Sequence, residues 1–117
     1  MPITSDVIRG HTDTIILARL MQEDSYGYRI NRDILQKTGK QYELKEATLY
    51  TAFRRLEKEG LIRSYWGDEE LGARRRYYTI TEEGKAAYET YRKEWEEAKG
   101  VIDALISSEE GKPCKKK

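Results

Sequence analysis

Two clusters of side chains in the middle of this 117-residue chain could bind a polyanion. One lies at helical spacing between residues 45 and 59, and the other is a run of three arginines before a β-type sequence. Guanidinium groups pair with phosphate or with guanine, and threonine hydroxyls bond to phosphates and base edges. The candidate contact residues are Lys45, Thr48, Tyr50, Thr51, Arg54, Arg55, Arg74, Arg75, Arg76 and Tyr77.

The formal net charge of +1 hides an uneven distribution of charge. Residues 40–80 carry nine basic and seven acidic side chains, whereas residues 81–111 carry four basic and nine acidic ones. Clustered bases indicate nucleic-acid binding better than net charge does. Each cluster alone also fits ordinary solvated surface, and the arginines could instead pair with Asp68, Glu69 and Glu70.

Hydrophobic periodicity predicts three short helices ahead of the arginines. The first spans Thr12–Met21, and the second spans Tyr26–Lys37 with Ser25 as N-cap. The third spans Lys45–Glu59 and stops at Gly60. Its apolar stripe is expected to face the core, which turns the threonines and arginines of the first cluster outward.

Two strands and a long helix complete the predicted order. Leu61–Trp66 and Arg75–Ile80 read as strands joined by a turn-rich segment. Thr81 is expected to cap a final helix, which Gly100 could kink. The apolar residues of this helix recur in steps of three and four, which is the spacing of a heptad seam. A small core could not bury the whole seam, so we expect a second copy of the chain to pack against it. The seam residues are Tyr88, Tyr91, Trp95, Ala98, Ile102 and Leu105.

The predicted fold class is therefore mainly α with a small two-stranded antiparallel wing. It is a winged helix-turn-helix followed by a long C-terminal dimerisation helix. We expect a DNA-binding domain over residues 1–80, the dimerisation helix over 81–108 and a disordered basic tail over 109–117. In this order of elements, double-stranded DNA is the favoured partner of the two clusters.

Several other classes of protein are disfavoured by the sequence. The single histidine, His11, has no acid–base partner by spacing, and no metal-ligand cluster or phosphate-binding glycine loop is apparent, so no enzyme, metal or other cofactor is expected. No signal peptide or membrane-length apolar run is apparent. With one cysteine, Cys114, in a polar tail, we expect a cytoplasmic protein, nucleoid-associated when bound to DNA.

Three separated blocks of the sequence resemble the PadR-like family of bacterial regulators. They read YGYRI at 26–30, ELKEATLYTAFRRLEKEGLI at 43–62 and GARRRYY at 72–78, followed by Thr81 and Gly84. The common family pattern has Gly and Pro where this chain has Ala47 and Thr51. In this departure, and in SYWGDE at 64–69, the chain resembles a small subgroup with one C-terminal helix, which includes the lactococcal multidrug-resistance repressor.

The family resemblance implies a homodimer that represses promoters. The subgroup resemblance further implies an opening at the dimer centre, where a tryptophan from each final helix stacks on a planar aromatic ligand. Trp95 occupies the matching position, Val7, Asp13 and Thr14 would line the opening, and Lys99 stands where the drug-binding relative has an acid. Trp95 could equally be plain seam packing.

Two alternative functions stay open at this point. The chain could be a winged-helix protein-interaction module, although such a module would tend to lose the threonines and arginines of the two clusters. It could also be a DNA-binding regulator with no small-molecule ligand, which a dry seam at Trp95 would support.

Overall fold

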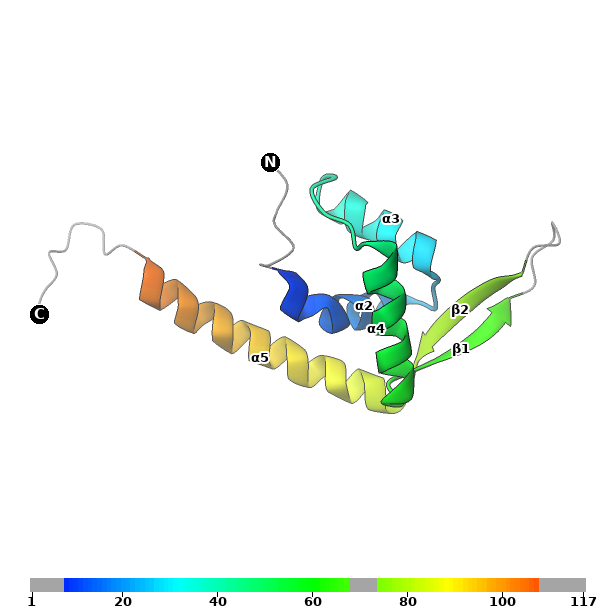
Figure 1. Cartoon of the computed structure of the whole chain (residues 1–117). Coiled ribbons are helices and arrows are strands. Elements are labelled where there is room, and N and C mark those ends of the chain that lie inside the picture. Colours follow the sequence, from blue (N-terminus) through cyan, green and yellow to red (C-terminus); the bar gives the residue numbers. More distant parts are fainter. Residues whose placement is uncertain (1–7, 68–73, 108–117) are drawn as a thin grey trace, which may run out of the picture.

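The computed structural model describes residues 8–67 and 74–107. Val7, the connection that holds Asp68, Glu69 and Glu70, and the basic tail predicted over 109–117 lie outside the described residues. The elements are, in order, η1 (Arg9–His11), α2 (Thr12–Gln22), α3 (Gly27–Lys37), α4 (Glu46–Lys58), β1 (Ile62–Gly67), β2 (Arg75–Ile80) and α5 (Glu82–Ile106) (Figure 1). This order confirms the predicted fold class.

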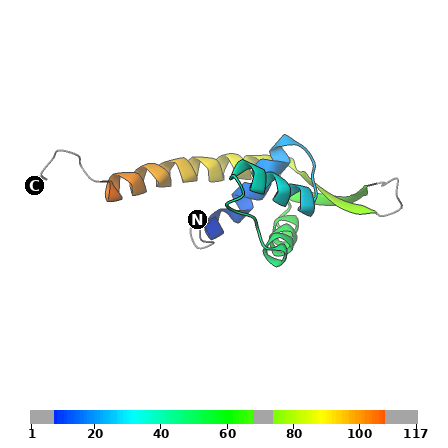
Figure 2. The same cartoon turned by 90° about the horizontal axis from the view of Figure 1, so that it is seen from above.

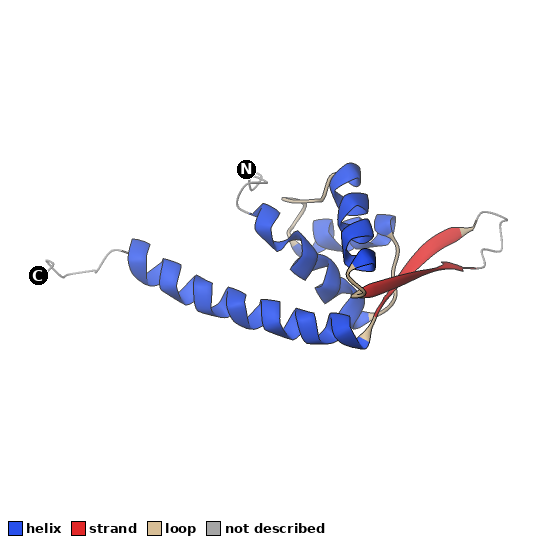
Figure 3. Ribbon diagram, turned by 60° about the horizontal axis from the view of Figure 1, so that its bottom comes forward, coloured by secondary structure: helices blue, strands red, loops and turns tan. Residues whose placement is uncertain are grey.

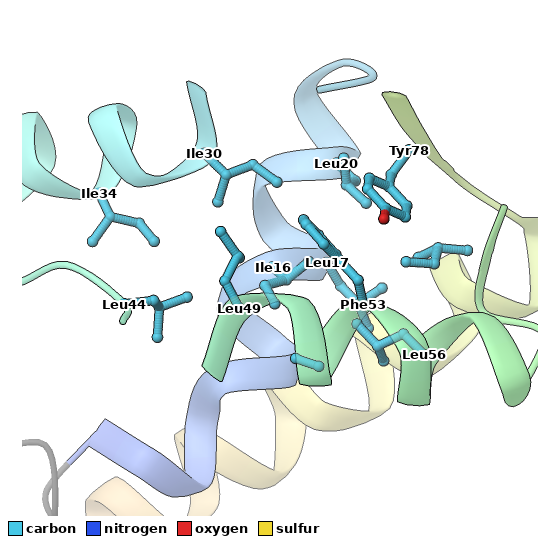
Figure 4. Packing of buried hydrophobic residues seen from close by; sticks show 12 residues of the cluster. Ile16, Leu17, Leu20, Ile30, Ile34, Leu44, Leu49, Phe53, Leu56 and Tyr78 are labelled. Atoms are coloured by element: carbon cyan, nitrogen blue, oxygen red, sulfur yellow. The ribbon is translucent and has the colours of Figure 1, made fainter. Parts of the chain in front are cut away.

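A hydrophobic core forms where α2, α3 and α4 meet the base of the wing (Figure 4). The ring of Phe53 stacks on that of Tyr78 at 3.9 Å between centroids, and this contact joins α4 to β2. Both side chains are buried. The other core residues are Ile16, Leu17, Leu20, Ile30, Ile34, Leu44, Leu49, Ala52, Leu56 and Ile62. The core fixes the position of α4, so its polar side faces solvent.

The end of α4 turns directly into the wing. Gly60 has a φ of +79°, a left-handed conformation that favours glycine. Its amide donates to the Glu57 carbonyl at 3.0 Å, and the Leu61 amide donates to the Leu56 carbonyl at 2.9 Å. This pair of bonds is a Schellman motif, which ends the helix and starts β1 two residues later. Gly60 is thus the helix stop that the sequence predicts.

The wing is a two-stranded antiparallel sheet in which Ile62 pairs with Ile80 and Gly67 with Arg75. A third segment joins it, because Ser25 makes an isolated bridge with Tyr78, with amide–carbonyl distances of 2.8 and 3.1 Å. Ser25 was expected as the N-cap of α3, and that prediction is wrong. Tyr26 is the cap residue and makes no side-chain cap bond. The backbone of Ser25 is bonded to β2, and its hydroxyl accepts from Arg29 at 3.1 Å.

Thr81 caps α5, as the sequence predicts. Its Oγ1 accepts from the Gly84 amide at 3.0 Å and donates to the Gly60 carbonyl at 2.7 Å. An added Cβ at Gly84 would lie 2.1 Å from the Leu61 carbonyl oxygen, so the first turn of α5 rests directly on the start of the wing.

Helix α5 then extends well beyond the other helices (Figures 2 and 3). Tyr88 and Tyr91 are half-buried against the core, whereas every residue from 92 to 107 is exposed. The helix is continuous through Gly100. Within the described residues, no helix is long and apolar enough to cross a bilayer.

Candidate nucleic-acid interface and adjoining pocket

The outward side of α4 carries the predicted polar cluster. Lys45, Thr48, Thr51 and Arg54 are all exposed, and Arg54 donates to the Thr51 hydroxyl at 3.4 Å. Helix α4 begins at Glu46, immediately after its N-cap residue Lys45, whose side chain makes no capping hydrogen bond. The N-terminal amides and the exposed cluster together could bind phosphates or base edges in a major groove.

Tyr50 and Arg55 are more constrained than the rest of this cluster. The Tyr50 ring lies edge-on to Phe53 at 5.5 Å, and its hydroxyl lies where an added Cβ on Gly27 would collide at 2.7 Å. Arg55 forms a two-pronged ion pair with Asp13 of α2, in which Nε donates to Oδ2 at 3.3 Å and Nη2 donates to Oδ1. This hydrogen bond raises the pKa of Arg55 above its usual value. The pair joins a predicted DNA-contact residue to a predicted pocket residue.

The three wing arginines divide between the two sides of the sheet. The side chains of Arg76 and Trp66 lie on the side that faces α4, because these residues are directly paired and Arg76 reaches Ser64 at 2.8 Å and Glu57 at 3.7 Å. The guanidinium of Arg74 lies 5.3 Å from the Trp66 ring centroid. Arg75 lies on the opposite side, 4.2 Å from the ring centroid of Tyr26.

On the side of the wing that carries Arg75, aromatic rings and one acid make contacts with the strands. Tyr77 stacks on Tyr65 at 5.6 Å and meets Tyr26 edge-on at 5.2 Å. The Tyr65 hydroxyl donates to Asp24 at 2.7 Å, which raises the pKa of Tyr65 to about 12. The wing is therefore held to the segment between α2 and α3 along this side.

A pocket of about 400 Å³ lies between the start of α2 and the middle of α5. Of the predicted ligand residues, Asp13, Thr14 and Trp95 line it together. His11 meets Trp95 edge-on at 4.8 Å between ring centroids, and Arg55 reaches the pocket from α4. The other lining residues are Gly10, Thr12, Tyr91, Glu94 and Ala98.

Lys99 stands one turn beyond Trp95 and does not line this pocket. Its ammonium group lies 5.9 Å from the Trp95 ring centroid and pairs with Glu96 at 3.2 Å. A cation therefore already sits near the indole, at a distance at which cation–π attraction acts. The neighbouring carboxylate partly offsets its positive charge.

Sequence reasoning missed three features of these sites. The link between Asp13 and Arg55 spans 42 positions, and no local pattern predicts it. The place of His11 against Trp95 likewise depends on how α2 and α5 pack. The position of Trp66 beside Arg76 could have been found, because the strand pairing places them opposite each other.

The seam residues of α5 fall into a half-buried group and an exposed group. Tyr88 and Tyr91 contact the core of their own chain, while Trp95 keeps 39% of its surface exposed and Leu105 keeps 77%. Val101 and Ile106, which the heptad steps do not include, are exposed beside Ile102 and Leu105. The outer half of α5 thus carries a contiguous apolar surface on the single chain.

Residues 16–90 match the family described as the transcriptional regulator PadR-like family. The chain belongs to this family. Its members are DNA-binding transcriptional regulators rather than enzymes. The matched region runs from the core of α2 through α4 and the wing to the first turns of α5, so it includes both polar clusters of this PadR-like chain.

Solved structures of relatives share the architecture. A transcriptional regulator from Clostridium thermocellum is 52% identical, with a TM-score of 0.82 over 90% of this chain and 99% of that one. A PadR family transcription regulator from Clostridium difficile is 36% identical, with a TM-score of 0.72 over 83% and 99% of the two chains.

The chain is also similar in sequence to an uncharacterised protein of Lysinibacillus sphaericus. The two are 46% identical over 89% of this PadR-like chain and 95% of the length of that protein.

Proposed function

We propose that this PadR-like regulator is a homodimeric repressor that binds pseudo-palindromic operator DNA and is released by a planar aromatic ligand. The observation that carries the DNA-binding part is the exposed polar side of α4 beside a wing that presents arginines. In this arrangement, α4 enters the major groove, and the wing contacts phosphates or the minor groove. We assign DNA contacts to eight of the ten predicted residues, of which Arg55 also holds Asp13. Arg75 and Tyr77 are not among them, because they lie on the opposite side of the wing.

The second copy is proposed to cover the outer half of α5. Ile102 and Leu105, with Val101 and Ile106, form an apolar surface that the described part of the chain leaves in solvent. Pairing two such helices buries this surface and sets the two α4 helices about 34 Å apart, one turn of DNA. Residues 1–80 would then act as the DNA-binding domain and 81–108 as the dimerisation helix.

The proposed ligand site lies at the dimer centre, where the pockets beside the two Trp95 side chains would meet and share one ligand. The indole offers a flat apolar face, and Asp13 and Glu94 place two carboxylates on the pocket wall. A planar cationic aromatic could stack on the ring and pair with Glu94, because both carboxylate oxygens of Asp13 are already held by Arg55. Ligand binding weakens DNA binding only if the ligand prefers a dimer geometry different from the one that DNA selects.

The DNA-binding proposal is tested with a fluorescein-labelled duplex at low salt. The Arg54→Ala, Arg74→Ala double variant should lower the affinity and flatten its dependence on salt, because fewer counterions are released. The matched control removes two exposed lysines of α5, Lys85→Ala with Lys93→Ala, and should bind nearly as the wild type does. Equal binding by all three proteins would refute the assignment of these surfaces.

The ligand proposal is tested by tryptophan fluorescence during titration with a planar cationic dye. Light scattering first establishes the dimer. Quenching that saturates at one dye per dimer and disappears in Trp95→Phe would support the site. If quenching persists in Trp95→Phe, the stacking role is refuted and Trp95 becomes seam packing.

A further inference from the structure

The wing carries an indole for which the proposed function has no role. Trp66 is one of only two tryptophans in the chain, and 53% of its surface is exposed. It lies in the distal half of β1, directly opposite Arg76 and next to the last described residue of that strand, Gly67. The wing extends away from the helical core (Figure 3).

Two guanidinium groups lie against this indole. Arg74 is 5.3 Å and Arg76 is 5.8 Å from its ring centroid, both within the range of cation–π attraction. Arg76 is also held by the Ser64 hydroxyl at 2.8 Å. The ring therefore positions two cations on one side of the wing and leaves much of its own surface open.

This side of the wing is continuous with the proposed DNA-reading side of α4. Arg76 and Ser64 both contact Glu57 of α4, which lies three residues beyond the exposed Arg54 and therefore beside it on the helix surface. The opposite side of the wing is occupied by packed tyrosines and by Arg75 over Tyr26. An object bound along α4 would thus meet the Trp66 side of the wing.

We propose that Trp66 is a DNA-contact residue of the wing. Its indole packs on the sugar edge of the minor groove, and Arg74 and Arg76 pair with the flanking phosphates. The inference rests on the proposed function and adds to it an apolar contact beside the two basic groups. DNA is the favoured occupant because the exposed indole lies against two cations, which suits a surface of alternating sugars and phosphates.

The direct test uses the Trp95→Phe protein, in which Trp66 is the only indole. Acrylamide quenching is measured with and without saturating duplex DNA at low salt, and binding is followed separately by the anisotropy of a labelled duplex. We expect Trp66 to be protected from acrylamide in the complex. The Trp66→Phe protein, in which Trp95 alone emits, should show no protection that depends on DNA.

Affinity supplies the second readout. Trp66→Ala should weaken binding about five- to tenfold through the lost apolar contact and leave the salt slope unchanged, since no charge is removed. Trp66→Phe should recover part of this loss. Arg74→Ala should lower the salt slope by about one, the signature of one lost phosphate contact.

The outcomes separate the inference from the proposed function. Tight duplex binding with Trp66 fully accessible to acrylamide, and unchanged affinity in Trp66→Ala, would overturn the inference and leave the DNA-binding proposal standing. If Trp66 becomes protected from acrylamide as the protein concentration rises in the absence of DNA, the indole lies in a contact between copies of the chain. That result would also overturn the inference. Failure of the wild type to bind any duplex at low salt would overturn both.

Discussion

The ion pair between Asp13 and Arg55 offers the sharpest test of how α4 is held. Both prongs of the guanidinium engage the carboxylate, yet 45% of the Arg55 side chain and 26% of the Asp13 side chain stay exposed. Exposed pairs contribute about 0.2–1 kcal/mol, and two-pronged geometry favours the upper part of that range. We expect a coupling energy of about 0.5–1 kcal/mol in the free energy of unfolding.

A double-mutant cycle measures this coupling. Asp13→Asn, Arg55→Gln and the double variant are unfolded in urea at low salt, and the non-additive part of the free-energy changes is taken as the pair energy. The control cycle uses Lys85→Gln and Glu82→Gln, an i,i+3 pair at 3.1 Å whose side chains are more exposed. That pair should couple by about 0.3 kcal/mol or less.

Salt gives an internal check on the same cycle. The Asp13–Arg55 coupling should fall in 1 M salt, where the Debye length is only about 3 Å. Additive single-variant effects at low salt, within about 0.3 kcal/mol, would refute the view that this pair fastens α4 to α2. A coupling no larger than that of the control cycle would refute it equally.

Further predictions concern the wing, the two glycines of α5 and the dimer. Asp24 raises the pKa of Tyr65 to about 12, so Tyr65→Phe should remove one tyrosine that ionises near pH 12 from an absorbance titration. The hydrogen bond between Tyr65 and Asp24 stabilises the wing below pH 10, and this stabilisation is lost as the pH rises toward 12. Gly84→Ala should lower the free energy of unfolding in urea by about 2–3 kcal/mol, since a backbone oxygen occupies the space that the added Cβ needs. Gly100→Ala, whose added Cβ meets nothing within 4 Å, should raise this free energy by up to about 1 kcal/mol. Leu105→Asp should shift sedimentation at micromolar concentration from dimer toward monomer, and an unshifted dimer would contradict the proposed pairing.

Local sequence signals predicted most of the elements. The β2 strand begins and ends where expected, and α2, α4 and β1 differ from the predictions by one residue at each shifted end. Gly60 and Thr81 stop and cap their helices because the φ preference of glycine and the hydroxyl of threonine act within a few residues. Such signals are readable without knowing the fold.

Contacts between distant segments were not readable in this way. Ser25 has the residue type of an N-cap, but β2 engages its backbone, and no signal near residue 25 indicates this. Asp13 and Arg55 were assigned to different sites, and the packing of α2 on α4 brings them together. The heptad pattern in α5 likewise does not separate Tyr88 and Tyr91, which contact their own core, from the exposed Ile102 and Leu105.

The junction between β2 and α5 has a mechanical consequence. Only Thr81 separates the last residue of the strand from the first of the helix, and its hydrogen bonds to Gly60 and Gly84 leave no slack in the connection. The wing and the long helix therefore meet at a rigid corner with Thr81 as the pivot, so a change in the direction of α5 would also turn the wing against the core that holds it. A six-residue strand is about 20 Å long, so a rotation of about 5° at the pivot moves its far end by roughly 2 Å. A small change in the angle of α5 would thus have to break or stretch the contacts of the wing with Asp24 and Tyr26.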